Sequence, residues 1–287
     1  MKIDEDFVVL RHESMRLTLD PQRGGSIRDF SWRGQDILRP TPAGAGDDPF
    51  EMACFPMVPY ANRVANGRFN FGGRPVQLQR NWPEDPHPLH GNGWRSSWGV
   101  VDTSVSRATV QFEGGADEWL GRYRCEQNFN LTDDGLAIEL SVRNLSDAPM
   151  PAMLGLHPYF GDVSRARMHA LVPRVWLTDD AALPVQEAQT PVDWRFEPPR
   201  ALDSVSLDNC FSGWNGTAAL RWPERTVTLR ATHCSYLHVY VPPQGDFFCI
   251  EPQTSATGAL GRDAGEATII APGERFAIRV QFAVGPA

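Results

Sequence analysis

Apolar and polar residues alternate along much of this chain, and this alternation constrains the fold more than any other feature. The final stretch, residues 275–284, places Phe276, Ile278 and Val280 two residues apart and continues the pattern to Val284. Residues 16–20 and 107–112 alternate in the same way. A period of two is typical of half-buried strands, whereas an amphipathic helix needs a period near 3.6. With 25 glycines and 24 prolines to punctuate the strands, the sequence predicts an antiparallel, all-β fold with few short helices.

Two hairpins stand out within this pattern. Residues 122–144 contain two alternating runs on either side of Asp133-Asp134-Gly135, and Asp-Gly favours the positive φ angles of a tight turn. Residues 69–76 contain a second hairpin with Gly72-Gly73 at its centre. Three regions lack regular patterning, namely 40–66, 80–98 and 178–216, and long loops in a compact chain are often functional. We find no repeat or linker and therefore expect residues 1–287 to form a single domain.

Composition and charge narrow the classes of partner. The 287 residues carry a net charge of −8, so a nucleic-acid partner is not expected. The five cysteines include no C-x-x-C pair, which indicates free thiols and a reducing compartment. The first six residues include three acids, and no apolar run is long enough for a membrane span, so we expect a cytoplasmic protein that does not interact with membranes. Glycine-rich nucleotide loops and the G-x-S-x-G elbow are also absent from the sequence.

Glu251 is the first candidate for chemistry. It follows the apolar run 247–250, and alternation places it on the same strand face as Phe247 and Cys249, with Pro252 expected to end the regular pairing. A carboxyl group at the mouth of an apolar strand loses solvation, and desolvation raises the pKa of a glutamate toward the range of a general base. The alternative is an edge glutamate in solvent or in an ordinary ion pair.

His157 ends another apolar stretch and also precedes a proline, which restricts its backbone. Other polar groups lie in or beside the irregular regions: Asn62-Arg63, His90 and Asp208. Each also has a structural interpretation, as a buried histidine, a surface arginine or a turn residue. A three-histidine metal site from His87, His90 and His157 is conceivable, but the spacing typical of structural zinc sites is missing, so we predict neither a metal nor a cofactor.

In order along the chain, these fragments resemble the aldose 1-epimerase (galactose mutarotase) family. The matching segments are 59–64 (PYANRV), 89–91 (LHG), 156–160 (LHPYF), 207–209 (LDN) and 250–252 (IEP), with a similar tail at 272–284. The resemblance implies one large antiparallel β-sandwich, a supersandwich of the galactose mutarotase type, with its site in a cleft on one sheet. It also implies a monosaccharide substrate whose α and β anomers are interconverted without a cofactor.

By this resemblance, Glu251 takes the proton from the anomeric hydroxyl and His157 protonates the ring oxygen. An ordinary histidine pKa near 6.5 would suit this step at neutral pH. Asn62, Arg63, His90, Asp208 and His238 would bind the sugar. His238 is a departure, because family members usually carry a glutamine there, and an amide offers a donor and an acceptor together. The preferred pattern of sugar hydroxyls is therefore left open.

Three alternatives accompany this interpretation. A hexose-6-phosphate 1-epimerase would need cations for the phosphate, which Arg63, Arg68, Arg74 and Arg95 could supply. A non-catalytic sugar-binding or sensor protein could use the same scaffold, although it would not need both Glu251 and His157. A metal-dependent sugar isomerase is the third. Aromatic residues near the motifs, namely Trp82, Trp94, Phe160 and Phe247, could stack on a sugar face.

Overall fold

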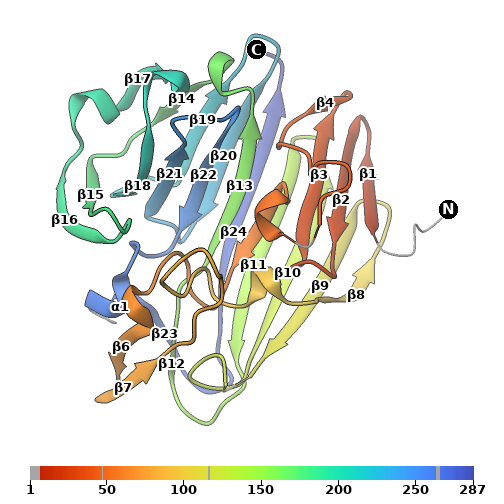
Figure 1. Cartoon of the computed structure of the whole chain (residues 1–287). Helices are drawn as coiled ribbons and strands as arrows, with labels where there is room; N and C mark the ends of the chain where they lie inside the picture. The colour runs from red at the N-terminus through yellow and green to blue at the C-terminus, as the bar shows by residue number, and fades with distance from the viewer. Residues whose placement is uncertain (1–6, 47, 116, 263–265) are drawn as a thin grey trace.

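A computed structural model describes residues 7–46, 48–115, 117–262 and 266–287. Its largest unit is a sheet of 11 strands, in which neighbouring strands are antiparallel (Figure 1). In spatial order these are β1 (Val8–His12), β2 (Met15–Asp20), β3 (Ser26–Trp32), β5 (Cys54–Met57), β13 (Gly155–Gly161), β22 (Phe247–Gln253), β21 (Tyr236–Val241), β18 (Leu207–Ser212), β15 (Arg174–Thr178) and β16 (Pro184–Gln189), with β4 (Gln35–Asp36) paired to β3.

A second antiparallel sheet has nine strands. In spatial order these are β17 (Phe196–Ala201), β14 (Arg167–Ala170), β19 (Thr217–Arg221), β20 (Thr226–Thr232), β24 (Arg275–Gly285), β11 (Gly135–Asn144), β10 (Tyr123–Thr132), β9 (Arg107–Gly114) and β8 (Gly99–Thr103). Two small sheets pair β6 (Arg68–Phe71) with β7 (Arg74–Gln77), and β12 (Met150–Ala152) with β23 (Thr268–Ile270).

Helices are few and short, as the sequence predicts. The described residues form one α-helix, α1 (Ala259–Arg262), and six 3₁₀ turns, η1 (Pro49–Glu51), η2 (Ala65–Gly67), η3 (Gly93–Arg95), η4 (Val163–Arg165), η5 (Val192–Trp194) and η6 (Leu202–Ser204). Within the part of the chain that the structure describes, no helix has the length and apolar character to cross a membrane.

One hydrophobic core joins the two large sheets. It contains Phe160 of β13 and Phe282 of β24, whose rings lie 6.4 Å apart between centroids. Because strand side chains alternate between faces, the remaining residues of the 11-stranded sheet point away from this core. The predicted all-β sandwich is confirmed, and all five cysteines are buried and unpaired, as expected.

The predicted hairpin of residues 122–144 is confirmed as β10 and β11, which pair from Tyr123–Asn144 to Thr132–Gly135. The turn itself consists of Asp133 and Asp134, and Gly135 begins the return strand. A Cβ atom on Gly135 would lie 1.9 Å from the carbonyl oxygen of Phe282. Gly135 also has a positive φ of 141°. This glycine therefore permits both that backbone conformation at the start of β11 and the close approach of β24. The hairpin at 69–76 is also confirmed, with positive φ at Gly72 and Gly73.

The prediction that residues 178–216 are irregular is wrong. This region contains β16, β17 and β18. The prolines of this region argued against strands, and β17 carries two of them, Pro198 and Pro199. They are accommodated because β17 lies at the edge of the nine-stranded sheet. Edge strands tolerate proline because one side of the backbone needs no ladder partner. Residues 80–98 remain irregular apart from η3.

Candidate active site

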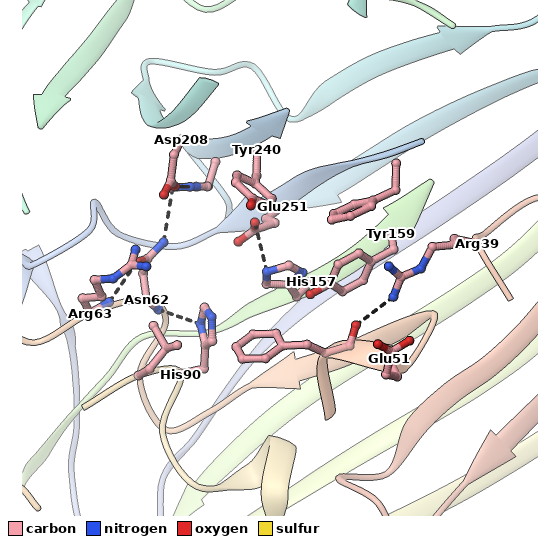
Figure 2. A pocket seen from close by; sticks show the side chains of 14 residues that line it. Arg39, Glu51, Asn62, Arg63, His90, His157, Tyr159, Asp208, Tyr240 and Glu251 are labelled. Carbon is pink, nitrogen blue, oxygen red and sulfur yellow. Dashed lines mark hydrogen bonds and ion pairs between the residues drawn. The ribbon is translucent and has the colours of Figure 1, made fainter. Parts of the chain in front are cut away.

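A cavity of about 380 Å³ opens on the face of the 11-stranded sheet that points away from the shared core (Figure 2). All seven residues that the sequence singled out line this cavity, although they come from distant parts of the chain: Asn62, Arg63, His90, His157, Asp208, His238 and Glu251. His157, Asp208, His238 and Glu251 lie on β13, β18, β21 and β22, in that order, and loops supply the other three.

Glu251 lies inside β22 rather than at its end. Pro252 pairs with Leu237 of β21, so the expectation that this proline ends the strand is wrong on that side. On the other side, the pairing of β22 with β13 is interrupted between Gly155–Gln253 and Tyr159–Cys249. Pro158 and Pro252 both lie in this gap, where neither can donate a ladder hydrogen bond. The interruption lies where His157 and Glu251 face each other.

The Glu251 side chain is almost completely buried, with 2% exposure. Its Oε2 accepts a hydrogen bond of 3.2 Å from Gln253 Nε2, and its Oε1 lies 3.3 Å from His157 Nε2. Burial raises the pKa of Glu251 to about 7, against the opposing effect of the nearby His238. The expected upward shift is therefore present, and burial is its main cause.

His157 differs from the sequence expectation. Its ring is stacked between Phe55 and Tyr159, with centroids 4.4 Å and 4.8 Å away. Burial, reinforced by repulsion from His238, lowers the pKa of His157 to about 3 rather than leaving it near 6.5. Its Nδ1 has no hydrogen-bond partner among the described residues. An aromatic sandwich without a partner at Nδ1 disfavours the imidazolium in the free site.

The loop that carries His90 is held against the loop that carries Asn62. Gly91 has φ of 68°, and a Cβ atom there would lie 2.2 Å from the carbonyl oxygen of Val58. Only glycine allows this approach. The Asn81 side chain holds the same segment, because it bonds to Leu89 N, Leu89 O and Gly91 O at 2.7–2.8 Å.

His90 and Asn62 are bonded to each other through two contacts. The Asn62 N–H donates to His90 Nδ1, and the His90 N–H donates to the Asn62 carbonyl, both at 3.2 Å. Both residues have positive φ, which asparagine and histidine tolerate better than most side chains. With Nδ1 as an acceptor, the proton of His90 lies on Nε2, and burial lowers the pKa of His90 well below its usual value. His90 is thus a neutral donor in the cavity wall.

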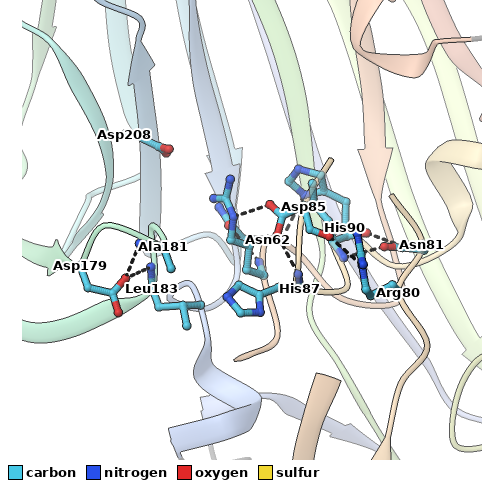
Figure 3. A network of polar contacts seen from close by, with 12 residues as sticks. Asn62, Arg80, Asn81, Asp85, His87, His90, Asp179, Ala181, Leu183 and Asp208 are labelled. Carbon is cyan, nitrogen blue, oxygen red and sulfur yellow. Dashed lines mark hydrogen bonds and ion pairs between the residues drawn. The ribbon is translucent and has the colours of Figure 1, made fainter. Parts of the chain in front are cut away.

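Arg63 is fixed from behind by Asp85. Its Nε donates to Asp85 Oδ2 at 2.8 Å. Asp85 Oδ1 in turn accepts the His87 N–H at 2.8 Å (Figure 3). The carboxylate thus orients the guanidinium through one edge. His87 does not line the cavity, and its Nδ1 accepts from the Asn66 N–H at 3.1 Å. The three-histidine metal arrangement considered from sequence is therefore not formed.

Asp208 of β18 and His238 of β21 form an ion pair, in which His238 is buried and Asp208 is partly exposed. His238 Nε2 lies 2.8 Å from Asp208 Oδ1, and His238 Nδ1 lies 3.2 Å from Asn62 Nδ2. Burial opposes a charge on His238, but the carboxylates of Glu251 and Asp208 outweigh it and raise the pKa of His238 to about 10. Both ring nitrogens of His238 are therefore engaged with protein groups, whereas Asp208 Oδ2 has no hydrogen bond to another described residue.

The charged form of His238 has a consequence for Asn62. Its Nδ1–H would meet the Asn62 NH₂ group, which points toward it while Asn62 Oδ1 accepts the Arg63 N–H at 2.9 Å. The oxygen and nitrogen of an amide can exchange places without moving the side chain. A short contact between an imidazolium and a carboxylate outweighs one neutral hydrogen bond. We therefore expect the charged His238, with Asn62 offering its oxygen.

The cavity also contains residues that the sequence did not suggest, namely Arg39, Phe50, Glu51, Leu89, Tyr159 and Tyr240. Tyr159 and Tyr240 follow His157 and His238 by two positions, so strand alternation could have identified them. Arg39 and Glu51 come from irregular segments and left no periodic signal. Of the aromatic residues considered for sugar stacking, only Phe247 lines the cavity. Phe160 packs into the core instead, and Trp82 and Trp94 pack around Phe50.

Two further groups bear on the alternatives. Among the described residues, His157, Cys249 and Glu251 form the one cluster of three potential metal ligands, with ligand atoms within 4.8 Å of one another. An ion there would bind the same two groups that face each other across the β13–β22 gap. Of the four arginines considered for phosphate, Arg68, Arg74 and Arg95 do not line the cavity, and Arg63 is already paired with Asp85.

Comparison with known proteins agrees with this architecture. The sequence profile of the aldose 1-epimerase family matches residues 6–283. An uncharacterized Escherichia coli K12 protein, YphB, is 35% identical over 95% of this chain and 98% of its own length. The E. coli K12 aldose 1-epimerase is 30% identical, but over only 47% of this chain and 39% of its own. A solved structure of an E. coli K12 protein proposed to be an aldose 1-epimerase superposes with a TM-score of 0.92 at 31% identity, over 98% of this chain and 99% of that one. The chain therefore belongs to the aldose 1-epimerase family and is an isomerase.

Proposed function

We propose that this enzyme interconverts the α and β anomers of a free, unphosphorylated aldose, with Glu251 and His157 as its catalytic pair. The observation that carries the proposal is the 3.3 Å separation of Glu251 Oε1 and His157 Nε2 on the floor of the cavity. The hemiacetal oxygens O1 and O5 are bonded to the same carbon, so two proton-transfer groups must lie close together to reach both.

The proposed reaction moves one proton from O1 to O5. Glu251 removes the proton from the anomeric O1–H, the electrons form the C1=O1 carbonyl, and the C1–O5 bond breaks. The released electron pair on O5 takes a proton from His157 Nε2. Rotation about C1–C2 presents the other face of the aldehyde, and the reverse steps close the ring as the opposite anomer. Atoms and charge balance without an added reagent.

The pair must hold one proton for this step. The reactive state combines the Glu251 carboxylate with the His157 imidazolium, and it contains as many protons as the uncharged state that burial favours. The two states therefore exchange by moving a proton within the pair, and the apparent pKa values belong to the pair as a whole.

The remaining groups would position the sugar. His90 offers a neutral N–H, Arg63 a guanidinium that is braced by Asp85, and Asp208 the oxygen that is not bonded to His238. We assign His238 and Asn62 to orienting Asp208 and His90, because their polar atoms are bonded within the wall of the cavity. Such prior fixation of binding groups reduces the entropy lost when the substrate binds.

The phosphorylated-sugar alternative is less well supported. A phosphate dianion needs several cations, and only Arg39 and Arg63 among the arginines line the cavity. Glu51 and Asp208 line it too and would repel a dianion. A free sugar, whose hydroxyl groups pair with both carboxylates and guanidinium groups, suits this mixed lining better.

The test replaces Glu251 by its isosteric amide. Anomer exchange of several neutral aldoses and their 6-phosphates is measured by polarimetry and by magnetization transfer in NMR, with and without a chelator. We expect the wild type to accelerate exchange and Glu251→Gln to lower kcat by about 10²–10⁴-fold, the usual contribution of a positioned acid or base. Glu126→Gln, on β10 of the other sheet, is the matched control.

Three results would contradict the proposal. Binding without acceleration by the wild type on any sugar would favour a sensor protein. A clear preference for 6-phosphates would favour the phosphorylated substrate. Activity that is lost with the chelator and restored by a divalent ion would favour a metal-dependent isomerase.

A further inference from the structure

Arg39 brings a positive charge to the catalytic cavity without a carboxylate partner. Its Nη2 donates to the carbonyl oxygen of Phe50 at 2.7 Å, and its guanidinium lies over the rings of Tyr159 and Phe247, 4.2 Å and 4.9 Å from their centroids. Among the described residues it forms no ion pair, and its Nε has no hydrogen-bond acceptor. Arg63, the other arginine of the cavity, is by contrast neutralised by Asp85 at 2.8 Å.

The two arginines lie at opposite ends of the cavity, with the catalytic pair between them (Figure 2). From Glu251 the order runs to His157 at 3.3 Å, then to the stacked ring of Tyr159, and then to the Arg39 guanidinium that covers that ring. Asp208 and Arg63 lie on the other side of Glu251. The cavity therefore has a direction relative to the reacting groups.

This direction assigns the atoms of a pyranose. If Glu251 faces O1 and His157 faces O5, the covalent path O1–C1–O5 points from the first residue to the second. The same path continues through C5 to the exocyclic C6 group, in the direction of Tyr159 and Arg39. The ring carbons C2 and C3, which carry hydroxyl groups, are left on the side of Asp208 and Arg63. Arg39 is thus the cationic side chain on the side of the C5 substituent, and Glu51 lies beside it at the same end of the cavity.

We propose that Arg39 forms a subsite for a negatively charged C6 group, so that the enzyme prefers hexuronic acids, which carry a carboxylate at C6, over neutral hexoses. A planar guanidinium matches the geometry of a carboxylate. One unpaired cation balances the single charge of a carboxylate, whereas a phosphate would keep an uncompensated charge close to Glu51. This proposal rests on the proposed function, because the positions of O1 and O5 follow from the assigned catalytic pair.

The experiment compares kcat/KM, by NMR anomer exchange corrected for the uncatalysed rate, on D-glucuronate, D-glucose, D-xylose and D-glucose 6-phosphate, and on D-galacturonate with D-galactose. We expect each uronate to exceed its neutral hexose by about 10- to 100-fold, the contribution of a hydrogen bond between charged groups. Xylose lacks C6 and should behave like the neutral hexoses.

Arg39→Met keeps the volume of the side chain and removes its charge. It should abolish the uronate preference mainly through KM while it changes neutral hexose turnover by less than about threefold, and Arg39→Lys should restore part of the preference. Arg74→Met, on the hairpin strand β7 outside the cavity, is the control. A uniform loss on all sugars in Arg39→Met would show that Arg39 is only structural and would overturn the proposal, as would a stronger preference for the 6-phosphate.

Binding separates this proposal from the proposed function. Calorimetric titration of glucuronate and glucose into Glu251→Gln requires no turnover. Tighter binding of glucuronate that disappears in the Glu251→Gln/Arg39→Met double variant would support the anionic subsite even if the wild type were inactive on every sugar. Equal affinity for the two sugars would overturn the subsite while leaving an active epimerase in place.

Discussion

The coupled protons of Glu251 and His157 predict how activity depends on pH. The reaction needs the pair to hold one proton, which is present between the pKa of about 3 for His157 and about 7 for Glu251. As pH rises through about 7, burial no longer keeps the proton on Glu251, and the pair loses the proton that O5 requires. Activity on free substrate should therefore fall on the alkaline side of neutrality.

The size of this fall follows from the loss of one proton. Above the pKa of about 7 for Glu251, kcat/KM should decrease about tenfold for each pH unit, so that at pH 9 it is about 100-fold below its plateau. Between pH 7 and about pH 4 kcat/KM should stay nearly constant, because its decrease on the acid side follows the pKa of about 3 for His157. A histidine that titrated near 6.5 would instead place a limb inside this range.

NMR magnetization transfer between the two anomers gives the catalysed rate at each pH after the spontaneous rate is subtracted. The ratio kcat/KM is the quantity to plot, since it reports the ionisation of the free enzyme. Circular dichroism at each pH verifies that the protein is folded, and Glu126→Gln should give the same profile as the wild type. Buffers of different chemical type at overlapping pH values separate buffer catalysis from the enzyme.

A profile that rises through pH 7 would refute this reasoning. It would mean that the carboxylate of Glu251 alone limits the rate and that O5 receives its proton from a group other than His157. A flat profile from pH 5 to 9 would exclude both groups as the coupled pair. A bell-shaped dependence of kcat/KM on pH with its acid limb near 6.5 would be consistent with the catalytic pair. It would contradict the strong lowering of the His157 pKa by burial.

Two further predictions concern the groups that support the site. Gly91→Ala should lower the free energy of unfolding in urea by about 3 kcal/mol, because φ is positive and the new methyl group would collide with the Val58 carbonyl oxygen. Gly73→Ala, which has positive φ but open space around it, should lower the free energy of unfolding by only about 1 kcal/mol. Equal losses in the two variants would contradict the argument. His238→Gln keeps one polar partner for Asp208 and should raise KM by less than about tenfold, whereas His238→Ala should raise KM more. In both variants kcat should change little in steady-state exchange kinetics. A loss confined to kcat would instead place His238 in the proton transfer.

Strand periodicity explains how much could be predicted from the sequence. The apolar run 247–250 and its alternation identified the strand that carries Glu251, whereas His157 was placed only at the end of an apolar stretch. The order of short motifs identified the loops of Asn62 and His90. The pKa of His157 was beyond reach, because it depends on Phe55 and Tyr159 closing over the ring from both sides. Arg39 was missed for a related reason: no periodic pattern marks its segment, and only the tertiary fold places its guanidinium over Tyr159.

The same alternation that forms the core also forms the cavity, and this links stability to chemistry. In β22, Phe248 and Ile250 enter the core between the sheets, while Phe247, Cys249 and Glu251 occupy the opposite face. A slip of one residue in the register of β22 would bury the carboxylate in the core and expose its apolar neighbours. Burying an unpaired charge costs far more than losing one ladder hydrogen bond. The gap in the β13–β22 ladder is thus tolerable, because the alternation on each side of it fixes the register that places Glu251 opposite His157.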